Sequence, residues 1–369
     1  MSKAPAEGLT ENIASRLAPW FAARLGLDDA RLSIDKPKTG FSADTLLVQV
    51  EGSTRYERVS RAYVVRIEHP GRHTFLGSTI GKQAAMMHLL RESGIPAPQL
   101  LGWEEDGPLI GASFLAMVRV DGHALKQHPS YHVAGLLHEL TERQRQECWL
   151  GALSTIAAIN RLPWQGRFEF LHDADHGAPS LDSYLGWLAA WRSEACAGRP
   201  HPIVDAAIAR LRRDRPDHAG VELLWGDSNP GNFLFTDHGA VAAVLDFEAA
   251  AIGPAEIDLS WWFFVDDMLA AGHPSPAGIP SRDEQIAAYE KALGRRVGDL
   301  AYYDIVSAVR MSLVMARLGL LLIGDGALPP ANDAWRSNPA VQRLAQLMAM
   351  PADEEMHGYW EMVRLMNAR

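Results

Sequence analysis

The hydrophobic pattern changes near Gly122, and this change constrains the fold more than any other feature of the sequence. Before it, short apolar runs alternate with polar residues, as at Leu46, Val48 and Val50, while residues 81–92 have the unbroken pattern of a helix. After it, long runs with helical spacing predominate. Because 369 residues exceed the usual size of one domain, we expect two lobes with an α+β composition. The strand-rich N-terminal lobe covers residues 1–121 and the larger, mainly helical lobe covers residues 122–369.

The N-terminus and the apolar stretches favour a cytoplasmic protein. Residues 1–27 combine apolar side chains at helical spacing with Glu7 and Glu11, which predicts an amphipathic helix rather than a signal peptide. The apolar stretches near Trp261 and Leu320 are interrupted by charged residues, so we expect neither to span a membrane. The two cysteines lack CxxC spacing, which fits a reducing compartment.

The overall charge disfavours two classes of partner. A formal net charge of −10 disfavours a general binder of nucleic acid or of anionic membranes, because such a protein needs a concentrated basic surface. We therefore expect no nucleic-acid partner and no membrane partner.

The strongest local signal is an ordered set of polar residues between short apolar segments. Residues 223–235 read LLWGDSNPGNFLF, and residues 241–248 read VAAVLDFE. In a hairpin-like arrangement the first loop presents Asp227 and Asn232 together, and the second strand ends at Asp246, near the same place. Polar residues of this kind also occur in ordinary turns.

This set suits phosphoryl transfer, a reaction in which catalysis consists mostly of positioning and charge stabilisation. A carboxylate such as Asp227 can orient the attacking hydroxyl and accept its proton. Oxygen atoms of Asn232 and Asp246 are hard ligands of the type that Mg²⁺ prefers.

The spacing of Asp227 and Asn232, with Asp246-Phe247-Glu248 following, resembles the catalytic loop and metal-binding segment of protein kinases. Together with residues 253–260 (GPAEIDLS), it makes the chain similar to the aminoglycoside phosphotransferase and choline kinase group from about Gly40 to Tyr303. The resemblance implies a protein-kinase-like fold and transfer of the ATP γ-phosphate to a hydroxyl of a small molecule.

By the same resemblance each polar residue has a role. Asp227 is the expected catalytic base, Asn232 and Asp246 are the expected Mg²⁺ ligands, and Asp258 is expected to accept hydrogen bonds from the catalytic loop. Asp258 can equally be read as an acid favoured by the dipole at a helix N-terminus. Trp225 stands where many relatives have His, and we expect activity to survive this change.

The expected phosphate site departs from the family pattern. The turn that contains Gly40 and Ser42 resembles the segment that covers the nucleotide phosphates, although an ordinary hairpin turn also explains it. Arg66 stands where the family usually has Lys, and a solvated strand cation is the alternative reading. Gln83 stands where a Glu usually pairs with that cation, so it can hydrogen-bond Arg66 but supplies no charge.

The expected adenine site lies in the last strand of the N-terminal lobe. Residues 114–120 resemble the strand and hinge whose backbone pairs with adenine, so Met117, Val118 and Arg119 are candidates, with ATP expected between the lobes. A core methionine is the alternative reading of Met117.

Several questions stay open at this level. The acceptor can be an aminoglycoside, a macrolide, choline, a sugar or another hydroxylated metabolite, and an aminoglycoside would need carboxylates such as Asp266, Asp267 and Glu290 to converge. A nucleotide-binding pseudokinase and a nucleotidyl or ADP-forming activity are the rival functions. Residues 172–176 (HDADH) have helical histidine spacing, yet the following Gly177 favours a loop over a metal site. The oligomeric state is not predicted.

Overall fold

The computed structural model describes residues 4–36, 44–217, 219–352 and 355–368, which form two compact units. The first unit comprises Met1–His73, Ser78–Arg91 and Ala97–Val120, and the second comprises Thr74–Gly77, Glu92–Pro96 and Asp121–Arg369. The first unit carries a β-sheet and the second is mainly helical, so the fold class is α+β as predicted.

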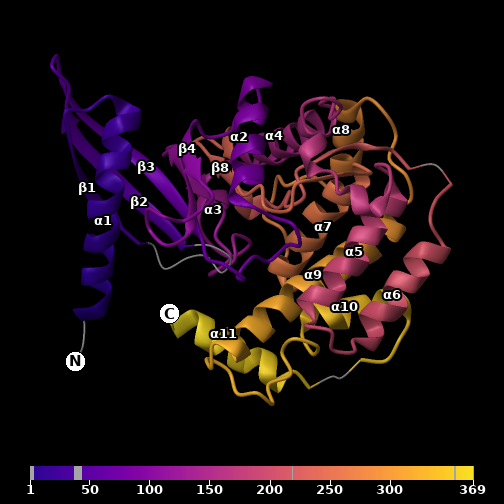
Figure 1. The fold of residues 1–369 in the computed structure, drawn as a ribbon. Helices are drawn as coiled ribbons and strands as arrows, with labels where there is room; N and C mark the ends of the chain where they lie inside the picture. Colours follow the sequence, from indigo (N-terminus) through magenta and orange to yellow (C-terminus); the bar gives the residue numbers. More distant parts are fainter. Residues whose placement is uncertain (1–3, 37–43, 218, 353–354, 369) are drawn as a thin grey trace. The chain divides into compact units, whose positions relative to one another are not determined.

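The first unit is built on an antiparallel sheet with strand order β1-β2-β3-β5-β4 (Figure 1). Its elements are α1 (Ala4–Leu25), β1 (Asp29–Asp35), β2 (Asp44–Ser53), β3 (Arg58–Glu68), α2 (Ile80–Glu92), β4 (Leu100–Glu104) and β5 (Ser113–Val118). Alternate residues of β2 and β3 are buried, because apolar side chains of period two face the core. Trp20 and Phe21 of α1 pack against Phe114 and Tyr63 of the sheet.

The second unit surrounds two small sheets with helices. Its strands are β6 (His123–Ala124), β7 (Glu222–Leu224), β8 (Phe233–Phe235), β9 (Val241–Val244) and β10 (Ala251–Gly253), and its short 3₁₀ segments are η1 (Glu169–Leu171), η2 (Ala174–His176) and η3 (Pro230–Asn232). Its helices are α3 (Leu136–Glu139), α4 (Glu142–Asn160), α5 (Leu181–Ala195), α6 (Pro202–Arg213), α7 (Glu256–Ala270), α8 (Arg282–Leu293), α9 (Leu300–Gly324), α10 (Pro339–Met348) and α11 (His357–Ala368).

The ends of these helices follow from local sequence. Thr141, Ser180 and Ser281 each cap a helix with a reciprocal side-chain bond three residues later, which satisfies backbone N–H groups that lack a partner within the helix. Gly294 ends α8 with φ +82°, a conformation that glycine adopts without strain.

β8 and β9 form an antiparallel hairpin whose second strand leads to Asp246, as expected. β7 pairs with β10, whereas β8 pairs with β9 and β6. The polar segment after β7 therefore connects the sheet of β7 and β10 with the sheet of β6, β8 and β9. The pairing of β7 with β10 joins strands that are separated in the sequence by β8 and β9.

Helix α9 is the most apolar long segment and lies in the core of the second unit. By length and mean hydropathy alone it is long and apolar enough to cross a membrane. The expectation that the charge at Arg317 interrupts this apolar stretch was therefore wrong. Its residues instead pack with those of α5, α6, α7 and α10 (Figure 1), and 61% of its most apolar stretch is buried. A buried core helix explains this composition.

Candidate active site

A polar loop, residues 225–232, follows β7 and is held by a buried carboxylate at the start of α7. Asp258 Oδ2 accepts the backbone N–H of Trp225 at 2.9 Å, and Oδ1 accepts that of Gly226 at 2.8 Å. Asn160 of α4 donates to Oδ2 at 2.8 Å, and the Ser228 hydroxyl donates to the Asp258 carbonyl at 2.8 Å. The carboxylate thus accepts hydrogen bonds from the loop, in the arrangement that the resemblance implied.

Gly226 is required at this turn. Its φ is +84°, and a Cβ atom there would lie 1.8 Å from the carbonyl oxygen of Ala249. Only glycine combines this dihedral with so close an approach of another backbone segment.

The Asp227 carboxylate is oriented by three N–H donors. Its Oδ1 accepts the Trp261 indole at 2.7 Å and the Asn229 amide at 2.8 Å, while its Oδ2 accepts the Asn232 amide at 2.7 Å. A carboxylate oxygen has two lone pairs, so Oδ1 is saturated and Oδ2 retains one. Burial raises the pKa of Asp227 and the Asp246 carboxylate raises it further, against the hydrogen bonds from Trp261 and Asn229 and the charge of Arg310.

Asn232 and Asp246 provide oxygen atoms that fit a magnesium ion. The Asn232 amide nitrogen donates to both the carbonyl and Oδ2 of Asp227, which directs that nitrogen to Asp227 and leaves Oδ1 as the ligand atom. Asp246 raises the pKa of Asp227 by charge repulsion, which a divalent cation would relieve. Within the described residues no cluster of three or more His, Cys, Asp or Glu could hold a metal. This donor set fits Mg²⁺, because Mg²⁺ is usually held by one or two carboxylates together with phosphates and water.

Asp246 has φ +60°, a left-handed conformation that is uncommon outside glycine. Trp225 stabilises this turn, because its indole N–H lies 3.0 Å from the carbonyl oxygen of Leu245 and 2.9 Å from that of Asp246. The backbone N–H of Leu245 donates to the Asn232 carbonyl at 2.8 Å. Trp225, at the position where the resemblance implied a histidine, thus links the polar loop to the Asp246 segment, a role that we did not expect.

Sequence reasoning missed Arg310 of α9 and treated Trp261 only as part of an apolar stretch. Arg310 is fully buried, donates to the Gly226 carbonyl through Nη2, and places its Cζ 4.3 Å from the centroid of the Trp261 ring. The sequence did contain a signal for Arg310, namely a charged residue within the most apolar helix. A buried charge needs a nearby partner, so such a residue indicates a polar contact in the core.

The predicted phosphate-site residues belong to the first unit. Gly40 and Ser42 lie outside the described residues. Arg66 lies on β3 opposite Thr45 and Leu115, and its charge lowers the pKa of Glu68, which burial raises. Gln83 is buried on α2, and the hydrogen bond described for its side chain goes to Ser78 at 3.2 Å, not to Arg66.

The predicted adenine-site residues lie at the end of β5. The backbone N–H of Val118 donates to the Gln99 carbonyl and that of Arg119 to the Ala62 carbonyl, at 2.8 and 3.0 Å. Both donors are therefore engaged within the sheet. Val120 is the next residue, and for its N–H no backbone acceptor is found within the described part of the chain. Met117 pairs with Val64 of β3 and Leu100 of β4.

The acids considered for a cationic substrate have other partners. Asp266 is buried and accepts hydrogen bonds from Tyr131 and His132, each at 2.8 Å. Glu290 accepts the backbone N–H of Val297 and pairs with Arg296. Asp173, in the segment 172–176, caps a 3₁₀ turn, which agrees with the loop expected there.

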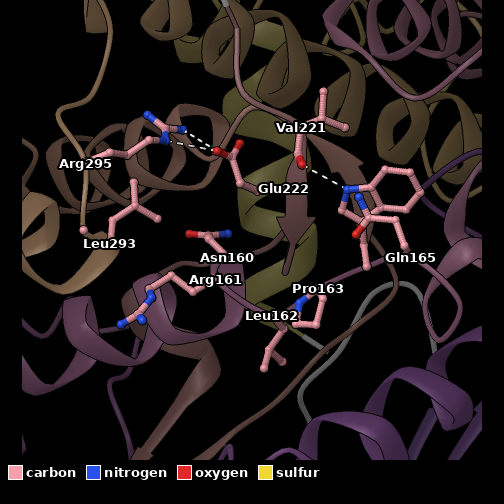
Figure 2. Close-up of a pocket in the computed structure, with 11 residues that line it drawn as sticks. Asn160, Arg161, Leu162, Pro163, Gln165, Val221, Glu222, Leu293 and Arg295 are labelled. Carbon is pink, nitrogen blue, oxygen red and sulfur yellow. Dashed lines mark hydrogen bonds and ion pairs between the residues drawn. The ribbon is translucent and has the colours of Figure 1, made fainter.

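A separate pocket of about 360 Å³ lies on the second unit (Figure 2). It is lined by residues 160–165, 221–222 and 293–295. Arg295 lines one side and is paired with Glu222 and Glu256. Neither Asp227 nor Asp246 lines it, so this pocket is distinct from the carboxylate site.

Comparison with known proteins identifies the family. The family model described as "Phosphotransferase enzyme family" matches residues 35–305. The chain belongs to this phosphotransferase family.

Curated proteins with a different name are also similar to part of this chain. Acyl-CoA dehydrogenase family member 11 of Mus musculus is 25% identical over 70% of this chain, and the match spans 32% of that protein. The chain thus corresponds to about a third of the length of this curated relative.

Solved structures establish the protein-kinase-like fold. A structure provisionally assigned as an aminoglycoside phosphotransferase, from Ralstonia eutropha, has a TM-score of 0.63 and 20% identity, with 92% of this chain and 98% of that chain covered. An aminoglycoside phosphotransferase in a ternary complex with ADP and hygromycin B has a TM-score of 0.51 and 14% identity, with 90% and 98% covered.

Proposed function

We propose that this phosphotransferase uses ATP and Mg²⁺ to phosphorylate a hydroxyl group of a small molecule. The observation that carries the proposal is the Asp227 carboxylate, whose Oδ1 has two N–H donors and whose Oδ2 keeps a lone pair for an acceptor hydroxyl. Asn232 and Asp246 lie beside it in the sequence order of a kinase site.

In the proposed reaction the hydroxyl oxygen of the acceptor forms a bond to the γ-phosphorus while the bond to the β,γ-bridging oxygen breaks. ADP leaves with that oxygen, and Asp227 Oδ2 orients the hydroxyl and receives its proton. A bound Mg²⁺ would neutralise phosphate charge. Asn232 Oδ1 and the Asp246 carboxylate are the groups proposed to hold it, and the hydrogen bonds to Asp258 keep the loop in place during the reaction.

We assign nucleotide binding to the first unit. Arg66 is proposed to contact phosphate. Its nearby acid is Glu68, which interacts electrostatically with Arg66, whereas Gln83 carries no charge. The adenine edge is proposed to pair with the backbone at Val120, since the N–H groups of Val118 and Arg119 are already used. We also propose a cytoplasmic location.

The proposal extends to the chemical class of the acceptor molecule. Asp266 and Glu290 are engaged with neighbouring residues, which argues against a cationic substrate recognised by these acids. The relatives named as acyl-CoA dehydrogenase family members match 70–72% of the chain in mouse, rat and human. We therefore propose acyl-CoA thioesters that carry a hydroxyl group as a further acceptor class, beside sugars, amino alcohols, macrolides and aminoglycosides.

The test is mass spectrometry of this acceptor panel after incubation with the protein, ATP and Mg²⁺. We expect one class to gain a phosphoryl group, and we expect Asp227→Ala to lower turnover by about 10²- to 10⁴-fold with ATP binding retained. Asp237→Ala is the matched control, because Asp237 is an exposed acid that pairs with His123. ATP binding without any phosphorylated product would favour the pseudokinase, and a nucleotidyl product would favour the other rival.

A further inference from the structure

Trp261 contacts the proposed base in a way that its sequence neighbours do not. The side chain is 2% exposed, and its indole N–H donates to Asp227 Oδ1 at 2.7 Å. The next residue, Trp262, is equally buried but donates to Gln285 at 3.0 Å, away from the polar loop. Both rings are packed in the core, but of the two only Trp261 also donates to the Asp227 carboxylate and helps to orient it.

Arg310 contacts both the Trp261 ring and the polar loop. It packs its guanidinium against the Trp261 ring and donates to the carbonyl of Gly226, the residue before Asp227. Its Nε and Nη1 atoms are buried without a hydrogen-bond partner within the described residues. Burying a cation with so few hydrogen bonds is costly, and apolar residues would fill this position of α9 more favourably. The nearby carboxylates of Asp227 and Asp258 provide the compensating charge.

We propose that Trp261 and Arg310 are positioning residues for phosphoryl transfer, a role that rests on the function proposed above. Trp261 fixes the rotation of the Asp227 carboxylate so that Oδ2 faces the acceptor hydroxyl. Arg310 fixes the Trp261 ring and the Gly226 peptide at the same time. Without the indole N–H, Oδ1 keeps only the Asn229 donor, and the carboxylate is less restricted in its rotation.

Steady-state kinetics of matched variants test this role. Trp261→Phe keeps the aromatic packing but removes the donor, so we expect kcat to fall about tenfold or more with the KM for ATP unchanged. Trp262→Phe is the control and should alter kcat less than about threefold. Equal effects of the two changes on kcat would overturn the proposal, because the role would then be packing alone.

The arginine has its own pair of variants. Arg310→Lys keeps the charge and should retain more turnover than Arg310→Met, which keeps the approximate length without the charge. Arg317→Met, in the same helix but beside Glu194, is the control for loss of an α9 cation. Equal turnover of Arg310→Met and the parent protein would overturn the assignment of Arg310. If the Arg310 variants do not fold, the Trp261 comparison decides alone.

A spectroscopic measurement separates this inference from the proposed function. The indole N–H signal of Trp261, assigned by its loss in Trp261→Phe, should shift in Asp227→Asn, while the Trp262 signal should not. Absence of the Trp261 shift would overturn the inference even in an active enzyme. A shift in a protein that phosphorylates no acceptor would retain the contact, and it would be the proposed function that had failed.

Discussion

Replacing Asp258 by asparagine should destabilise the protein and lower its turnover together. The two carboxylate oxygens accept from different donors, with Trp225 and Asn160 on Oδ2 and Gly226 on Oδ1. Asparagine keeps only one oxygen, so its NH₂ group must face at least one buried N–H whichever way it is oriented. The orientation with fewer clashes places the NH₂ group opposite the Gly226 N–H.

The magnitude follows from these contacts. One buried donor without a partner costs about 1–3 kcal/mol, and the remaining bonds to Trp225 and Asn160 lose the strength that the negative charge confers. Arg310 also loses a compensating charge. We expect the free energy of unfolding to fall by about 3 kcal/mol, with a loss of kcat because the loop that carries Asp227 loses an anchor.

Asp266→Asn is the matched control in the same helix. Tyr131 and His132 both bond to a single oxygen of Asp266, which the asparagine oxygen can replace. Urea unfolding followed by tryptophan fluorescence should therefore give a loss of about 1 kcal/mol or less for this variant, with kcat retained. The reasoning is refuted if the two variants lose the same stability, or if Asp258→Asn loses stability without losing turnover.

Two further predictions concern strain and pH. Asp246→Gly should leave the free energy of unfolding unchanged or raise it by up to about 1 kcal/mol, because glycine tolerates φ +60°. Calorimetry of the same variant should show loss of Mg²⁺-dependent nucleotide binding. A clear loss of stability would contradict the argument from backbone strain. Burial lowers the pKa of His201 to about 4, so the unfolded chain binds the proton first as the pH falls, and stability should decrease from about pH 6.5 toward pH 4. The expected decrease in the free energy of unfolding is about 2 kcal/mol at pH 5. It should be absent in His201→Phe but present in His273→Phe, a control at an exposed histidine. An unchanged pH dependence in His201→Phe would refute the role of His201.

Local patterns were sufficient for the elements and for part of the site. Alternation in β2 and β3, the helix at residues 81–92 and the change of character near Gly122 all arise between residues close in the chain. Asp227 and Asn232 are also near neighbours in the sequence, and the turn between them brings their side chains into hydrogen-bond contact. The ordered set that ends at Asp246 was enough to indicate phosphoryl transfer and its family.

The tertiary structure decided which side chains contact the polar loop that carries Asp227 and Asn232. Trp261 and Arg310 reach the polar loop from α7 and α9, and β7 pairs with β10, the strand that follows the Asp246 segment. Sequence periodicity indicates which side of a helix is buried but not which element it faces. Hydrogen bonds across helices depend on the packing of the whole second unit, and that packing turned two core residues into neighbours of the proposed base.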